Sequence, residues 1–105
     1  MTKNEFLEEV VKPVFEQIKG LFEDKNKNYG TDADIYYNFR QMAQRNYMTD
    51  DLEAQYSILE ILLDKHNTSL IKNGLSDTEF LQRQCDRILY SLLAIGMYLL
   101  HKNQD

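Results

Sequence analysis

The chain has 105 residues and a mass of 12.5 kDa, enough for one domain built around one core. Hydrophobic residues make up 43% and charged residues 28%, and 12 Lys and Arg against 17 Asp and Glu give a net charge of −5. This composition excludes a disordered or fibrous chain, and the acidic balance argues against binding a DNA or RNA polymer through a basic face. A single cysteine, Cys85, excludes an internal disulfide framework and a cysteine-rich zinc site.

The first predicted helix covers about residues 3–25 and opens with a capping box of Thr2 and Glu5. Apolar residues then recur at three- and four-residue spacing: Leu7, Val10, Val14, Ile18 and Leu21. Pro13 lies inside this pattern and lacks the N–H that a regular helix requires at that position. We therefore expect a kink near residues 9–12.

Residues 25–34 are predicted to form a turn, in which Gly30 permits positive φ and Asp32 or Asp34 caps the next helix. That short helix is expected over about residues 35–45. Its expected apolar face consists of Ile35, Phe39 and Met42.

Two lysines and a tyrosine in this turn, Lys25, Lys27 and Tyr29, precede a helix N-terminus, where backbone N–H groups and positive charge can hold an anion. The alternative is that the segment only connects two helices.

The third predicted helix is opened by Thr49, Asp50 and Glu53 and ends at Gly74 in a left-handed cap. Its expected core stripe is Leu52, Tyr56, Leu59, Leu63, His66 and Leu70. His66 is interpreted as a hydrogen-bonded core residue, because a zinc site would need more ligands than His101 supplies.

The last predicted helix covers about residues 77–102 and opens with a capping box of Ser76 and Glu79. One face is expected to contain Leu81, Cys85, Ile88, Leu92 and Leu99, and a second apolar set extends it: Leu89, Leu93, Met97 and Leu100. A helix that is apolar almost all round is either central to a bundle or covered by a second subunit.

No alternating strand pattern competes with these helices, so the predicted fold is all-α, a single four-helix, bundle-like domain over residues 1–105 that forms a homo-oligomer. The N-terminus lacks the apolar segment of a secretory signal. The most apolar stretch, residues 88–100, is shorter than the roughly 20 residues that a membrane span needs. We therefore expect a cytoplasmic protein with no membrane association.

Three carboxylates are candidate ligands for a divalent metal. Glu60 and Asp64 share one edge of the third helix, and Asp86 lies on the flank of the last helix. Mg²⁺ prefers such oxygen ligands. The alternatives are a solvated helix face for the first two and, for Asp86, an ion pair with Arg83 or Arg87.

Other chemical groups are few. Lys65 lies beside the predicted core stripe, where it either reaches a phosphate or extends to solvent. Cys85 has the surroundings of an inert buried thiol. Because no Walker loop, GxGxxG motif or Ser/His/Asp arrangement occurs, we assign no catalytic residue.

Three short segments carry a family resemblance. The first combines Lys25, Tyr29-Gly30, Asp32, Asp34, Asn38-Phe39 and Ala43; the second is Leu63-Asp64-Lys65-His66; and the third is Arg83-x-x-Asp86-x-Ile88-x-Tyr90-x-x-Leu93. Together they resemble small bacteriophage and prophage proteins related to the MazG-like, all-α nucleotide pyrophosphohydrolases. The resemblance covers residues 25 to about 95.

The resemblance implies an oligomeric helical bundle with a nucleotide pocket between helices. Together with the residues considered above, it leads to these predicted ligand contacts: Lys25, Lys27, Tyr29, Asn38, Lys65, His66, Arg83 and Asp86. In active members of the group, an E-x-x-E pair and an E-x-x-D pair bind Mg²⁺, which polarises the phosphate and positions water. Here Glu60 is followed three residues later by Leu63, and Arg83 replaces the first acid of the second pair.

The leading prediction is therefore a phage-type nucleotide-binding protein with a degenerate site. It would act in the host cytoplasm and sequester a defence signalling nucleotide rather than hydrolyse it, with no required cofactor. One alternative is a Mg²⁺-dependent NTP or dNTP pyrophosphohydrolase whose metal ligands are Glu60, Asp64 and Asp86. The other is a protein-binding inhibitor or adaptor that does not bind nucleotides.

Overall fold

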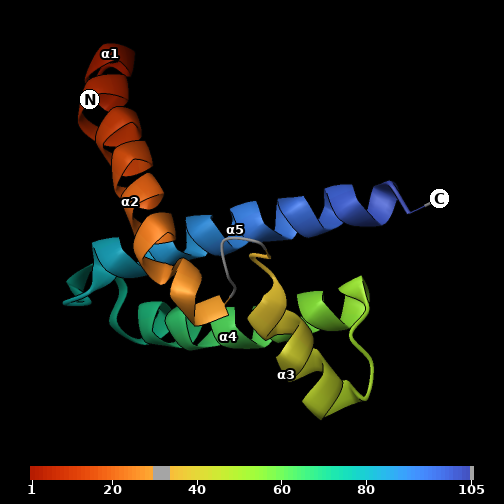
Figure 1. Ribbon diagram of the computed structural model, residues 1–105. Helices are drawn as coiled ribbons and strands as arrows, with labels where there is room; N and C mark the ends of the chain where they lie inside the picture. Colours follow the sequence, from red (N-terminus) through yellow and green to blue (C-terminus); the bar gives the residue numbers. More distant parts are fainter. Residues whose placement is uncertain (30–33, 105) are drawn as a thin grey trace.

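The computed structural model describes residues 1–29 and 34–104, and of residues 24–29 it describes the backbone only. This part of the chain contains helices and no strand, which confirms the all-α class and is compatible with a helical bundle (Figure 1). The elements are α1 (Lys3–Phe6), a π-helical turn η1 (Leu7–Val11), α2 (Lys12–Tyr29), α3 (Tyr37–Tyr47), α4 (Leu52–Asn73), a 3₁₀ turn η2 (Gly74–Ser76) and α5 (Phe80–Lys102).

The N-terminal helix is interrupted by the π-helical turn η1. Its start is capped as predicted, because the Thr2 hydroxyl oxygen accepts a hydrogen bond from the Glu5 N–H at 3.1 Å. At the end of η1 the Lys12 N–H donates to the Leu7 carbonyl, five residues back. Pro13 cannot donate to the carbonyl of residue 9, and its ring would clash with that carbonyl, so the helix takes one extra residue per turn here. The helix irregularity that Pro13 predicts near residues 9–12 is this π-helical turn.

Two of the predicted helix starts are wrong in their capping residue. The cap of α4 is Asp51, not Thr49 or Asp50, and its carboxylate accepts from the Ala54 N–H at 2.9 Å. Thr49, Asp50 and Asp51 are all good caps, and only the one whose oxygen reaches a free N–H of the first turn is used.

The second wrong capping residue lies before α5. The predicted box of Ser76 and Glu79 is replaced by Asp77, whose carboxylate accepts from the Glu79 N–H at 2.8 Å before the helix starts at Phe80. Gly74 ends α4 with a positive φ of 56°, which suits glycine, but its ψ of −140° lies outside the left-handed helical region, so the predicted left-handed cap is wrong in form.

The core lies where α3, α4 and α5 meet and where α2 packs on α5 around Ile18 (Figure 1). Its buried apolar residues are Ile18, Tyr36, Phe39, Ala43, Ala54, Ile58, Leu59, Cys85, Leu89, Leu93 and Met97. On α4 the buried residues are Ala54, Gln55, Ile58, Leu59 and His66, so Leu59 and His66 of the predicted stripe are inside, whereas Tyr56 is exposed. Two small residues, Ala43 and Ala54, belong to this core and leave room for close packing of α3 on α4.

The buried face of α5 is the second apolar set of the sequence, represented by Leu89, Leu93 and Met97. The first set, which contains Leu81, Ile88, Leu92 and Leu99, is exposed, and only its member Cys85 is buried. The Tyr36 hydroxyl donates to the Leu93 carbonyl at 2.8 Å and ties the start of α3 to this buried face.

The molecule is extended. Its radius of gyration is 15.6 Å, against about 13 Å for a compact chain of this length. Figure 1 shows the reason, because α1 and the first part of α2 project from the body as an arm. Within the described residues, none of the helices combines the length and the apolar character that crossing a membrane requires.

Candidate functional site

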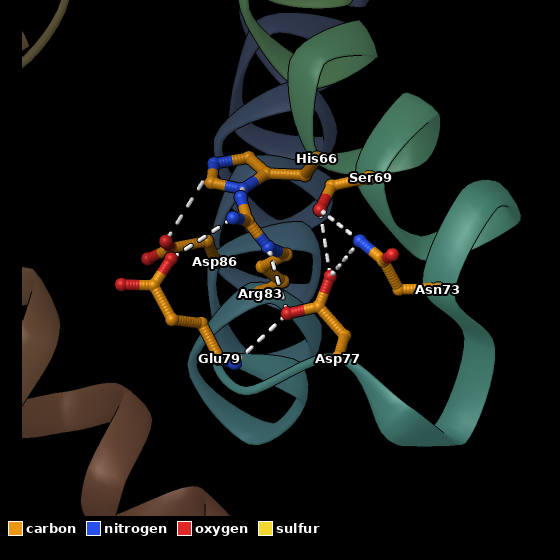
Figure 2. A network of polar contacts seen from close by, with 7 residues as sticks. All are labelled: His66, Ser69, Asn73, Asp77, Glu79, Arg83 and Asp86. Atoms are coloured by element: carbon orange, nitrogen blue, oxygen red, sulfur yellow. Dashed lines mark hydrogen bonds and ion pairs between the residues drawn. The ribbon is translucent and has the colours of Figure 1, made fainter.

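Seven polar residues join the second half of α4 to the start of α5, and we call them the polar cluster (Figure 2). They are His66, Ser69, Asn73, Asp77, Glu79, Arg83 and Asp86. The 3₁₀ turn η2 reverses the chain between the two helices, so residues of the second half of α4 meet residues just before and within the start of α5.

Asp77 is the centre of the polar cluster, with a side chain that is only 3% exposed. One carboxylate oxygen accepts from the Ser69 hydroxyl at 2.6 Å and from the Asn73 amide at 3.4 Å. The other accepts from the Glu79 N–H at 2.8 Å and from Arg83 Nε at 3.3 Å. These donors favour the ionised form, with the Ser69 hydroxyl first among them, and lower the Asp77 pKa to about 2.

This pKa predicts acid sensitivity. Because the folded pKa of Asp77 is about 2 and the ordinary value is 3.8, the ionised carboxylate stabilises the fold above pH 4. That contribution is lost as pH falls from about 4 to 2. We expect Asp77→Asn to lower the melting temperature by several degrees at pH 7 and to flatten the fall of stability over that acid range. Melting curves of both proteins between pH 2 and 7 test this, and parallel pH profiles would contradict it.

Arg83 lies at the solvent side of the polar cluster, with its side chain 22% exposed. Its Nη2 donates to the carboxylate of Glu79 at 2.9 Å, in addition to the contact with Asp77. The two carboxylates differ sharply, because the Glu79 side chain is 64% exposed whereas that of Asp77 is buried. The inner contact is therefore structural, and the outer one is a surface ion pair.

His66 and Asp86 form the buried side of the polar cluster. Nε2 of His66 lies 3.6 Å from a carboxylate oxygen of Asp86, and Nδ1 of His66 lies 3.5 Å from Nη1 of Arg83. A guanidinium only donates, so the arrangement suits a neutral His66 that accepts at Nδ1 and carries its proton on Nε2, toward Asp86. Gln82 donates to the other oxygen of Asp86 at 3.4 Å.

The structure brings together three of the predicted ligand contacts, His66, Arg83 and Asp86. Lys65 is exposed on α4 next to His66. Asn38 is half-buried on α3 and is not one of the seven residues of the polar cluster.

Three predicted contacts, Lys25, Lys27 and Tyr29, have side chains outside the described residues. For Asp86, an ion pair with a neighbouring arginine was the expected alternative to a metal. Its partners include His66 and Gln82, neither of which the sequence indicated.

The sequence analysis missed Asp77, Ser69 and Asn73 as parts of the polar cluster. The capping pattern at residues 76–79 did indicate the turn before α5. It pointed to the hydroxyl of Ser76, however, and not to the carboxylate of Asp77.

The three predicted metal ligands do not converge. Glu60 and Asp64 are exposed on α4, and Asp86 is buried against His66. Glu60 instead accepts a hydrogen bond from the Tyr56 hydroxyl, which raises the Tyr56 pKa. Among residues 1–29 and 34–104, no group of three or more His, Cys, Asp or Glu side chains is placed to hold a metal ion.

A hollow of about 400 Å³ opens between α4 and α5 and is lined by Asp64, Asn67, Leu70, Ile71 and Arg87. The Oδ1 atom of Asn67 is buried and accepts no hydrogen bond from any described residue. Asn67 directly follows His66, and Arg87 follows Arg83 by one turn, so the hollow adjoins the polar cluster along both helices.

Comparison of the chain with protein-family models, with curated proteins and with solved structures finds no match.

Proposed function

We propose that the protein binds a nucleotide through its phosphate at the polar cluster and releases it unchanged. The observation that carries this proposal is the unequal pair of carboxylates on Arg83. A surface ion pair is worth at most about 1 kcal/mol, so an incoming phosphate can replace the exposed carboxylate of Glu79 at little cost. Asp77 then holds the inner edge of the guanidinium in place, and the outer edge meets the phosphate in a charge-assisted hydrogen bond.

Lys65 supports the same assignment. It lies one turn before Ser69 on α4, so both project from the same side of the helix, the side on which Ser69 reaches Asp77. Lys65 would thus add a second cation on the α4 side of the polar cluster. The adjoining hollow supplies room for a nucleoside.

Binding without hydrolysis is proposed because the sequence lacks both complete acidic pairs of the hydrolases that it resembles. If the chain is viral, such binding would sequester a signalling nucleotide in the host. A nucleotide panel tests this directly: the protein is incubated with each nucleotide and Mg²⁺, and the solution is chromatographed before and after heat denaturation. Depletion followed by recovery of the intact nucleotide is the expected result, and hydrolysis products would contradict it. An unchanged solution in both samples would favour a protein-binding role.

Single substitutions should change affinity in both directions. Lys65→Ala and Arg83→Ala are each expected to weaken binding of the nucleotide found by that panel about ten- to a hundredfold, the effect of one charge-assisted contact. Glu79→Gln should strengthen binding, because it removes the competing carboxylate from Arg83. Titration calorimetry measures all three.

Arg45→Ala is the control, since Arg45 is an exposed cation on α3 with no part in the polar cluster. Because Arg83 also contacts Asp77, its variant needs a melting curve as well. Unchanged affinity in Glu79→Gln and in Lys65→Ala would remove the polar cluster from the site.

A further inference from the structure

A groove of about 460 Å³ lies where α2 crosses α5, and residues that lead into α3 bound it as well (Figure 1). Its floor consists of four buried residues, Ile18, Tyr36, Leu89 and Leu93. Exposed apolar side chains of both helices, such as Phe15 on α2 and Leu92 on α5, form its walls. A mostly apolar hollow of roughly 300–1,000 Å³ is the usual form of a small-molecule site. We call it the α2–α5 groove.

The floor of the α2–α5 groove suits a hydrocarbon. Its one polar side-chain atom is the Tyr36 hydroxyl oxygen, whose proton is donated to the Leu93 carbonyl at 2.8 Å. A polar group placed on this floor would lose its hydration without gaining a donor in return. A methylene group placed there gains affinity by leaving water. The part of a ligand that lies on the floor is therefore an apolar chain.

Lys19 gives the α2–α5 groove a charged edge, because it is the one charged residue among the described residues of the lining. It is exposed, so its stem can line the wall while its ammonium group stays in water. At about 100° per residue, Phe15 and Ile18 lie about 40° and 100° to one side of Lys19 around α2. Glu16 and Glu23 lie about 40–60° to the other side. Lys19 thus separates the groove from the nearest acids of its own helix.

We propose that the α2–α5 groove binds a free fatty acid, with the hydrocarbon chain on the floor and the carboxylate beside Lys19. Charge complementarity selects the carboxylate, since the cation stands at the edge of a lining that is otherwise uncharged. The head group keeps most of its hydration there, so the contact needs no buried charge. The net charge of −5 opposes an anion only weakly, because charges more than about 8 Å apart are largely screened at physiological salt. This site shares no residue with the polar cluster and does not depend on nucleotide binding.

Three ligands with the same chain and different head groups test the proposal. Decanoate, decanol and decylammonium are titrated into the full chain by calorimetry, each below its micelle concentration and in 0.15 M salt. One decanoate should bind per chain, about fivefold more tightly than decanol, which is the upper end for an exposed ion pair. Decylammonium should bind most weakly, against the sign of the net charge. Nonanoate should bind about fourfold more weakly than decanoate, because it buries one methylene less. Equal affinities for the three head groups, or no saturable binding of decanoate, would overturn the proposal.

Two pairs of variants test the place of binding. Lys19→Met keeps the apolar stem and should remove the preference for decanoate over decanol, whereas Lys12→Met, at an exposed lysine of α2 outside the groove, should retain it. Leu92→Glu should weaken decanoate binding more than about tenfold, because it places a carboxylate in the apolar wall. Leu99→Glu is its matched control, since Leu99 is 52% exposed and Leu92 48% exposed on the same helix, and Leu99 is not part of the lining. A preference that survives Lys19→Met, or equal losses in the two leucine variants, would overturn the assignment to this groove.

Discussion

Replacing Gly96 by alanine is expected to destabilise the fold by about 2 kcal/mol, although alanine is the better helix former by about 1 kcal/mol. The cause is steric. A Cβ atom at Gly96 would overlap the Tyr36 hydroxyl oxygen, which is buried and donates to the Leu93 carbonyl. The tyrosine must move, and its hydrogen bond is lost with the packing.

A double-mutant cycle checks this cause. In Tyr36→Phe the nearest ring atom would lie 3.4 Å from the new Cβ, so Gly96→Ala in that background should be neutral or stabilising. Urea denaturation at one fixed protein concentration, followed by circular dichroism, gives the four free energies of unfolding. Equal costs of Gly96→Ala in both backgrounds would show that the hydroxyl is not the obstacle.

Removing the carboxylate of Asp86 should have the larger effect, a loss of about 3 kcal/mol for Asp86→Ala. The side chain is buried, and its removal takes away an acceptor toward which N–H groups of His66 and Gln82 point. Asp86→Asn keeps one acceptor oxygen of the same shape and should cost about 1 kcal/mol. The difference between the two variants in urea denaturation measures the acceptor role, and equal losses would contradict it.

The same pair of variants separates binding from catalysis. If Asp86 holds His66 in place, Asp86→Asn changes stability and nucleotide affinity and has no turnover to abolish. Mg²⁺-dependent release of pyrophosphate from an NTP by the native chain, lost in Asp86→Asn, would restore the hydrolase alternative. Binding that survives EDTA supports the proposed function.

The fold class and the helical segments were predictable because helical periodicity and capping residues are local properties of the sequence. It was less predictable from the sequence which face of each helix is buried. On α5, Leu92 and Leu93 are both apolar neighbours, and only the packing of α2, α3 and α4 decides that Leu93 is inside. Periodicity identifies two acceptable faces on such a helix and does not choose between them.

The polar cluster was predicted in part, for a related reason. His66 stands out because it interrupts an apolar stripe, whereas Arg83 and Asp86 were indicated as a possible ion pair and by the family resemblance. Asp77 does not stand out in the sequence, because polar residues are common in turns. Its role depends on Ser69 and Arg83, which come from two helices, and that meeting is a tertiary property.

The π-helical turn η1 has a consequence for how the protein can change over evolution. The turn contains one residue more than an α-helix needs, and one residue corresponds to a rotation of about 100° around the helix axis. The face that α1 presents is therefore set by residues 7–11 independently of α2. An insertion or deletion there re-aims α1 alone, while α2, with Ile18 and the rest of the core, keeps its position. The N-terminal turn can thus diversify in descendants of this sequence without loss of the fold.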